Sequence, residues 1–195
     1  MPWWAGANPN TTTEECYGKA DRIHELFQNR HYFPLFVAST RNNLPALRAL
    51  LDGKADVNMR TLRHTALFTS CKLGHEACAR LLLERKADPE LVHPDATKMP
   101  VNALMASAAE GRVTCAQLLL EWKANIDYAT NPGNMTSLIA ACYRNRVNTV
   151  RVLLDAKANA SIRSTTKEGY TALETARDAG HEEVVNILWA AGVRV

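Results

Sequence analysis

Apolar residues recur along the chain at a spacing that predicts a series of short helices. One set recurs at i, i+3, i+6 and i+7: Val147, Val150, Leu153 and Leu154. A second set recurs at i, i+3 and i+4: Cys78, Leu81 and Leu82. Residues three and four positions apart lie on one face of a helix. Each set therefore predicts an amphipathic helix with one buried side.

Leucine doublets mark a repeated unit. They are Leu50-Leu51, Leu82-Leu83, Leu119-Leu120, Leu153-Leu154 and, with tryptophan second, Leu188-Trp189. Their first members are 32, 37, 34 and 35 residues apart. An independent set has the same four spacings: Leu35, Leu67, Leu104, Leu138 and Leu173. Because the two sets of leucines share the same spacings, they predict five similar units, each built from two short helices.

The first helix of each unit has recognisable ends. Side chains able to cap a first turn stand before four of these helices: Thr65, Asn102, Thr136 and Thr171. Glycine or asparagine follows each first helix, as expected for a left-handed residue: Asn42, Gly74, Gly111, Asn145 and Gly180. Alanine-rich stretches such as "ALMASAA" and "SLIAACY" let neighbouring helices approach closely, so we expect a tightly packed inner layer.

The stretches "HTALFTSCKLGHEACARLLLERKADPE" and "YTALETARDAGHEEVVNILWAAG" resemble the ankyrin repeat. Several family positions match in each of the five units, although only Pro34 preserves the proline of the family's Thr-Pro-Leu-His. The resemblance implies an all-α ankyrin-repeat solenoid of five helix-turn-helix units over residues 32–195. The approximate unit boundaries are 32–59, 60–96, 97–130, 131–165 and 166–195.

Residues 1–31 do not fit the repeat. Thr12 and Glu15 have the spacing of a capping box. An apolar face follows, formed by Cys16, Ala20, Ile23, Leu26 and Phe27. We therefore expect a capping helix at residues 13–31 that covers the first unit, because solenoids need terminal caps. Residues 1–12 form a predicted docking tail that carries Trp3 and Trp4.

Four units have lysine where the ankyrin family has glycine after the second helix: Lys54, Lys86, Lys123 and Lys157, called the lysine strip below. A left-handed conformation costs a lysine roughly 1 kcal/mol there, and a cation at a helix C-terminus recovers about 0.3 to 1 kcal/mol. The strip either meets an anionic partner or consists of solvated helix ends. Acidic residues two positions upstream favour the second interpretation: Asp52, Glu84, Glu121 and Asp155.

Composition and chemistry narrow the function classes. The 195 residues are 47% hydrophobic and 22% charged, which is typical of a soluble globular protein, and the net charge of +3 is too diffuse to indicate nucleic-acid binding. No apolar run is long enough to span a bilayer, and no signal-peptide pattern is present. Five cysteines without a CxxC pair predict buried thiols in a reducing compartment, in the cytoplasm or an organelle interior.

The sequence predicts no catalytic, cofactor-binding or metal-binding residues. Glycine-rich phosphate loops and HExxH are absent. His75 and His181 stand at the family's Gly-His position, where the resemblance implies that the ring caps a helix. The prediction is therefore a protein that is not an enzyme and that needs no small-molecule substrate.

The resemblance implies a partner surface on the fingertip loops and on the exposed face of the first helices. The fingertip candidates are Leu62, His64, Met99, Val101, Met135 and Tyr170. Their apolar members either form a contact strip or fold under the loops. The helix-face candidates are Arg41, Lys72, Tyr143 and Arg144, of which Tyr143 and Arg144 are the best anchors because tyrosine and arginine dominate interface hot spots.

These features predict a protein-protein interaction module. One form is an accessory subunit of a larger assembly, such as an organelle or membrane complex. It would be docked by Trp3 and Trp4, the fingertips and the bare C-terminal end. The alternative is a freestanding adaptor or inhibitor that binds client proteins through the concave face. Both forms imply protein partners and no nucleic acid.

Overall fold

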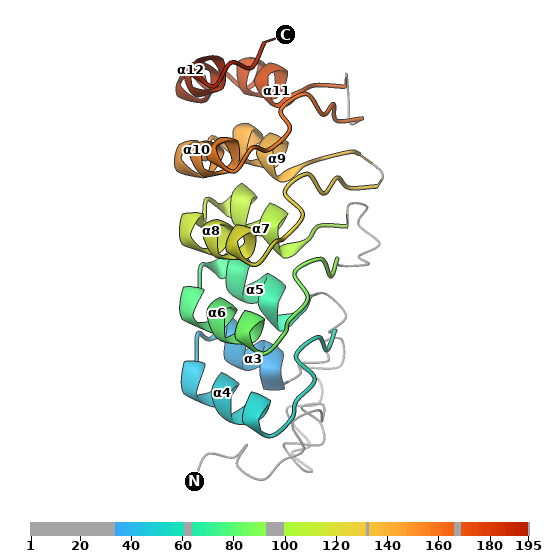
Figure 1. Cartoon of the computed structure of the whole chain (residues 1–195), viewed down its shortest axis with the longest axis vertical. Helices are drawn as coiled ribbons and strands as arrows, with labels where there is room; N and C mark the ends of the chain where they lie inside the picture. Colours follow the sequence, from blue (N-terminus) through green and yellow to red (C-terminus); the bar gives the residue numbers. More distant parts are fainter. Residues whose placement is uncertain (1–33, 61–63, 93–99, 132, 166–168, 195) are drawn as a thin grey trace, which may run out of the picture.

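The computed structural model describes residues 34–60, 64–92, 100–131, 133–165 and 169–194. These residues contain ten α-helices and no strand, and the helices are stacked as successive pairs along the long axis of the molecule (Figure 1). The prediction of an all-α repeat solenoid is confirmed. The predicted tail at 1–12 and capping helix at 13–31 lie outside the described residues, and the unit boundaries stay predictions.

Each pair consists of a first helix, a short turn and a second helix. The pairs are α3 (Pro34–Thr40) with α4 (Leu44–Asp52), α5 (Ala66–Leu73) with α6 (Glu76–Glu84), α7 (Ala103–Glu110) with α8 (Val113–Glu121), α9 (Ser137–Tyr143) with α10 (Val147–Asp155), and α11 (Ala172–Asp178) with α12 (Glu182–Ala190). The turns within pairs lie on the side of the column opposite the longer loops between pairs (Figure 1).

The helices form two layers. First helices pack most closely on the first helices of neighbouring pairs, and second helices form the other layer. Small buried residues such as Ala38, Ala66, Ala103 and Ala141 allow this close approach. The tightly packed inner layer expected from the alanine-rich stretches is therefore present.

Predicted capping residues begin four of the first helices. Their side-chain oxygens accept hydrogen bonds from the backbone N–H three residues later: Thr65 from Phe68 (3.2 Å), Asn102 from Met105 (2.9 Å), Thr136 from Ile139 (3.3 Å) and Thr171 from Glu174 (3.3 Å). Each bond satisfies an amide of the first turn that has no partner within its helix. The predicted starts of these helices are confirmed.

The core is formed by buried side chains of both helix layers. Val150 and Leu153 are fully buried, while Val147 and Leu154 are half-buried and pack against the core. Cys78, Leu81 and Leu82 are buried as well. The two sequence patterns therefore identify core faces correctly.

Cysteines of the described residues behave as small apolar side chains. Cys71, Cys78, Cys115 and Cys142 are buried free thiols, whereas Cys16 lies outside the described residues. Burial raises the pKa of the Cys142 thiol to about 12, so it stays protonated at neutral pH.

Residues of the lysine strip adopt the predicted left-handed conformation. Their φ values are 65° at Lys54, 67° at Lys86, 64° at Lys123 and 68° at Lys157. The residues that end the first helices also have positive φ, from 52° at Asn42 to 81° at Gly74. These backbone predictions are confirmed.

Replacing Lys86 with glycine tests the strain at this turn. Glycine adopts a φ of 67° without the cost that lysine carries. We expect the free energy of unfolding in urea to stay constant or rise by up to about 1 kcal/mol. Lys72→Gly is the control: it introduces glycine into the last turn of α5, a right-handed helix, and should lower stability by about 1 kcal/mol. A loss of stability in Lys86→Gly contradicts the strain argument.

Candidate protein-binding surface

One edge of the column is built from the turns within pairs. It comprises equivalent positions of the first four pairs, residues 40–44, 72–76, 109–113 and 143–147, and is called the turn row below. Each segment contains the end of a first helix and the start of a second helix. Because the pairs are stacked, the four turns lie above one another along one side of the column (Figure 1).

Positive charge dominates the turn row. Its basic residues are Arg41, Lys72, Arg112, Arg144 and Arg146. Its two acidic residues are Glu76 and Glu110, and Glu76 forms an ion pair with Arg80 at 3.2 Å. Arg146 is half-buried and the other four basic residues are exposed. The row is therefore a solvent-facing basic surface.

Two of these arginines connect successive pairs. The Nε of Arg112 donates a hydrogen bond to the carbonyl of Lys72 (3.3 Å), and the Nε of Arg146 donates to the carbonyl of Ala109 (3.0 Å). Both acceptors belong to the preceding first helix. These bonds satisfy carbonyls at the helix end, where no partner exists within the helix.

Each arginine crosses a glycine of the preceding turn. A Cβ added to Gly74 would lie 2.9 Å from Cδ of Arg112, and a Cβ added to Gly111 would lie 2.9 Å from Cδ of Arg146. A side chain at either glycine would therefore displace the arginine, in addition to being strained by the positive φ. Arg112 and Arg146 cannot keep these positions over a residue that has a side chain.

Histidines take the place of arginine where the preceding turn contains asparagine. Nδ1 of His75 lies 2.8 Å from the carbonyl oxygen of Ser39, and Nε2 of His181 lies 3.1 Å from that of Tyr143. Neither ring caps the helix that its own residue begins. The expectation that these rings cap a helix is confirmed, and the capped end belongs to the first helix of the preceding pair.

Apolar side chains are exposed within the turn row. Tyr143 is 60% exposed and Leu73 is 39% exposed, in α9 and α5 respectively. The helix-face candidates Arg41, Lys72, Tyr143 and Arg144 are thus brought together along one exposed edge. Sequence reasoning missed Arg112 and Arg146. The signal for them was a basic residue at the family's Gly-His position in the third and fourth units.

The fingertip candidates that the structure describes, His64, Val101, Met135 and Tyr170, are less exposed than the helix-face candidates. His64 stacks on Phe68 with ring centroids 4.2 Å apart. Val101, Met135 and Tyr170 are half-buried. Met135 packs against the core, which favours the interpretation that it folds under its loop. Trp3, Trp4, Leu62 and Met99 lie outside the described residues.

The loops that follow the second helices are bonded from pair to pair. A side-chain oxygen of one loop accepts a hydrogen bond from a backbone N–H of the next: Asn58 from Asp88 (2.8 Å), Glu90 from Asn125 (2.6 Å) and Asp127 from Asn159 (2.8 Å). Together with the hydrogen bonds of Arg112, Arg146, His75 and His181, they connect successive pairs on both sides of the column. The scaffold that presents the surface is therefore rigidly cross-connected.

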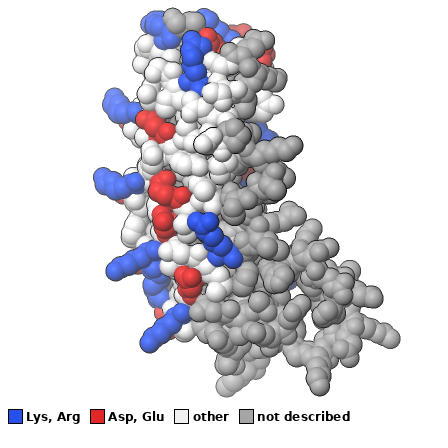
Figure 2. Space-filling view, turned by 90° about the vertical axis from the view of Figure 1, so that its right-hand side faces the viewer, with Lys and Arg blue, Asp and Glu red and all other residues white. Residues whose placement is uncertain are grey.

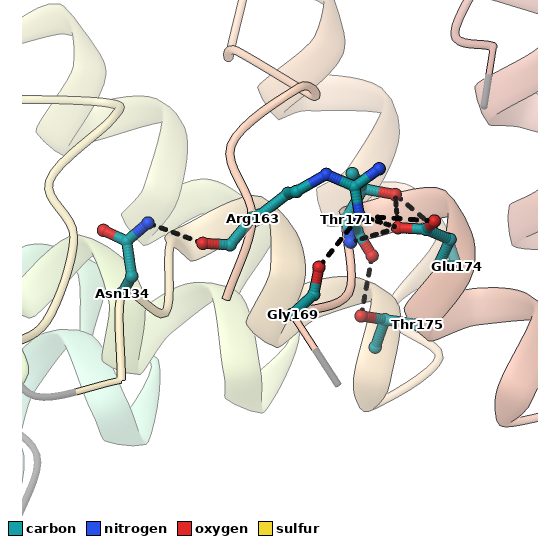
Figure 3. Close-up of polar contacts among 6 residues, drawn as sticks. All are labelled: Asn134, Arg163, Gly169, Thr171, Glu174 and Thr175. Carbon is teal, nitrogen blue, oxygen red and sulfur yellow. Dashed lines mark hydrogen bonds and ion pairs between the residues drawn. The ribbon is translucent and has the colours of Figure 1, made fainter. Parts of the chain in front are cut away.

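A denser polar network joins the last two loops (Figure 3). Asn134 Nδ2 donates to the carbonyl of Arg163 (2.6 Å), and the Arg163 guanidinium bonds Gly169 O (3.0 Å) and Glu174 (3.1 Å). Thr171 and Glu174 form a capping box at the start of α11. The backbone N–H of Thr171, then its hydroxyl and Arg163, lower the pKa of the Glu174 carboxyl.

Replacing Glu174 with glutamine is expected to flatten the acid limb of the stability profile. A carboxyl with a lowered folded-state pKa contributes stability above its unfolded value, about 4.3, and that contribution is lost as pH falls through the folded value. Urea midpoints between pH 6 and pH 3, about the window of this titration, should therefore fall less for Glu174→Gln than for the parent. Thr171→Ala removes the hydroxyl partner and should lower stability at neutral pH by about 1 kcal/mol. If the urea midpoint falls equally between pH 6 and pH 3 in the parent and in Glu174→Gln, the lowered pKa of Glu174 does not contribute to stability.

Two further observations concern membrane-spanning helices and metal sites among the described residues. No described helix has both the length and the apolar composition needed to cross a membrane. Within the same residues, no three side chains of the metal-ligating types lie close enough together to hold an ion.

Comparison with known proteins identifies the repeat. A family model for ankyrin repeats in three copies matches the chain at residues 14–93, 35–131 and 104–195. The overlapping matches extend over most of the sequence. No curated protein matches the chain.

Proposed function

Because the chain belongs to the ankyrin-repeat family, whose repeats are protein-protein interaction modules, we propose that it is an accessory subunit docked in a larger protein assembly. Members of the family are typically binding modules without catalysis, and we extend this to the present chain. In this proposal its partners are proteins rather than nucleic acids or small molecules. Its work is to present a rigid surface.

Exposed large apolar side chains on several sides of the column carry this proposal. Tyr143 is 60% exposed on the turn row. Trp122 is 43% exposed at the C-terminal end of α8, whereas the turn row lies at the N-terminal ends of the second helices. Trp189 is 41% exposed in α12, where Arg177 lies 5.1 Å from its ring centroid. Aromatic residues are enriched in interface cores. Exposure at the turns within pairs and at the C-terminal ends of second helices is expected of a subunit with several neighbours.

A freestanding adaptor or inhibitor is the alternative. It would use one face, and the turn row is the best candidate because Arg41, Lys72, Tyr143 and Arg144 are exposed together there. In that case Trp122 and Trp189 would have no role in binding.

The native size of the protein in a gentle extract of its source distinguishes the two roles. An assembly subunit should migrate in a large particle, with the same neighbours at constant stoichiometry in mass spectrometry. Migration near the chain's own mass of 21.6 kDa contradicts the subunit role. Tyr143→Ala and Trp122→Ala then identify the contacts, because a subunit held on several sides should be weakened by either change.

A further inference from the structure

Charge balance distinguishes the turn row from the lysine strip. The turn row has five basic and two acidic residues, a net excess of three positive charges. The segments that carry the lysine strip, residues 52–56, 84–88, 121–125 and 155–159, contain five basic and six acidic residues. On the side of the loops, Figure 2 shows basic side chains at successive heights along one edge with acidic side chains beside them. In the first four pairs the turn row is therefore the edge with excess positive charge, whereas the equivalent segment of the fifth pair, residues 178–182, contains Asp178 and Glu182.

The turn row also presents arginines in fixed positions. The Nε hydrogen bonds to Lys72 O and Ala109 O hold the guanidinium groups of Arg112 and Arg146 over the preceding glycines. Within the described residues neither group donates a further hydrogen bond, and both side chains reach solvent. A fixed guanidinium loses less freedom on binding a carboxylate than a mobile one.

Spacing along the row matches an extended peptide. Helices of neighbouring pairs pack about 8 to 10 Å apart, and an extended chain advances about 3.3 Å per residue. Successive turns therefore lie roughly three peptide residues apart. Leu73 and Tyr143, exposed in the second and fourth pairs, offer apolar contacts between the charges.

We propose that the turn row binds an extended acidic segment of a protein partner, with carboxylate side chains at about every third position. The inference rests on the proposed function, since it names the chemistry of a partner of the same module. Arg112 and Arg146 form the fixed centre of the site. Arg41, Lys72 and Arg144 extend it to both sides, and Tyr143 and Leu73 contribute apolar contact that a nucleic-acid backbone would not use.

Fluorescence anisotropy with the full chain tests the proposal. The probe is a labelled peptide of about 12 residues, extended enough to span the row. It has glutamate at every third position and leucine, serine and glycine elsewhere, and its control has glutamine in place of glutamate. The triple variant Arg41→Glu, Lys72→Glu and Arg144→Glu alters exposed side chains of the turn row that make no hydrogen bond within the described residues. Lys86→Glu, Lys123→Glu and Lys157→Glu give the same charge change on the lysine strip.

The parent should bind the glutamate peptide about tenfold or more tightly than the glutamine peptide. The turn-row variant should lose about tenfold in affinity, because three attractions become repulsions. The lysine-strip variant should stay within about twofold, since that charge lies on another edge. Circular dichroism checks that both variants keep their helices.

Three results overturn the proposal. They are equal affinity for both peptides, equal weakening by both triple variants, and tighter turn-row binding of a single-stranded oligonucleotide of the same charge. The proposed function fails separately, through the native size of the parent protein. A chain that migrates in a large assembly without binding the glutamate peptide keeps its proposed function and loses only this inference.

Discussion

Replacing Leu104 with alanine is expected to lower the free energy of unfolding by about 2 to 5 kcal/mol, the usual cost of a cavity at a fully buried leucine. Leu104 is 0% exposed in α7, the first helix of the central pair. This helix packs against α5 on one side and α9 on the other. The cavity therefore weakens contacts with both neighbouring pairs.

Neighbour contacts make this position more sensitive than one at the end of the column. In a solenoid, stability is approximately the sum of unit stabilities and contacts between adjacent units. A defect in the central pair can separate unfolding into two steps. Urea denaturation followed by circular dichroism should show a lower midpoint, and a broadened transition if the two halves unfold separately.

Leu73→Ala is the matched control. Leu73 is 39% exposed at the end of α5, so its truncation leaves no enclosed cavity and should cost less than about 1 kcal/mol. Similar losses in Leu104→Ala and Leu73→Ala contradict the assignment of the core.

The fold could be predicted from the sequence because its signals are local. Four first helices are capped by hydrogen bonds between residues only three positions apart in the sequence: Thr65, Asn102, Thr136 and Thr171 accept them. The left-handed turn positions also depend on a few neighbouring residues. Such features require only chain geometry and side-chain type. Repetition at five positions made the local signals stronger.

The candidate site was less accessible to sequence reasoning because it depends on contacts between units. Arg112 bonds a carbonyl 40 residues away and Arg146 one 37 residues away. The arrangement is evident only in three dimensions. An arginine lies over the turn of the preceding pair where that turn contains glycine, and a histidine bonds the preceding pair where its turn contains asparagine. Fingertip burial has the same cause, since Met135 is covered by packing against the core.

Replacing Gly111 with alanine is expected to lower the free energy of unfolding by about 2 kcal/mol. Roughly 1 kcal/mol comes from the φ of 70°. A comparable amount comes from displacing Arg146, whose Cδ would lie 2.9 Å from the new Cβ. That displacement breaks the hydrogen bond from Nε of Arg146 to Ala109 O, worth about 1 kcal/mol.

Gly180→Ala separates the two contributions. Gly180 has the same φ of 70°, but an added Cβ there meets nothing within 4 Å. Its replacement should therefore cost only the backbone strain, about 1 kcal/mol. Urea denaturation of the two single variants gives the contact contribution as their difference.

A double-mutant cycle with Arg146→Ala completes the test. Without the arginine side chain, Gly111→Ala should cost no more than Gly180→Ala, which gives a coupling energy of about 1 kcal/mol between positions 111 and 146. An unchanged cost of Gly111→Ala in the Arg146→Ala background would show that the arginine does not lie across this turn. The same result would remove the fixed guanidinium on which the acidic-segment site is centred, so this cycle tests the geometry of the turn row independently of any partner.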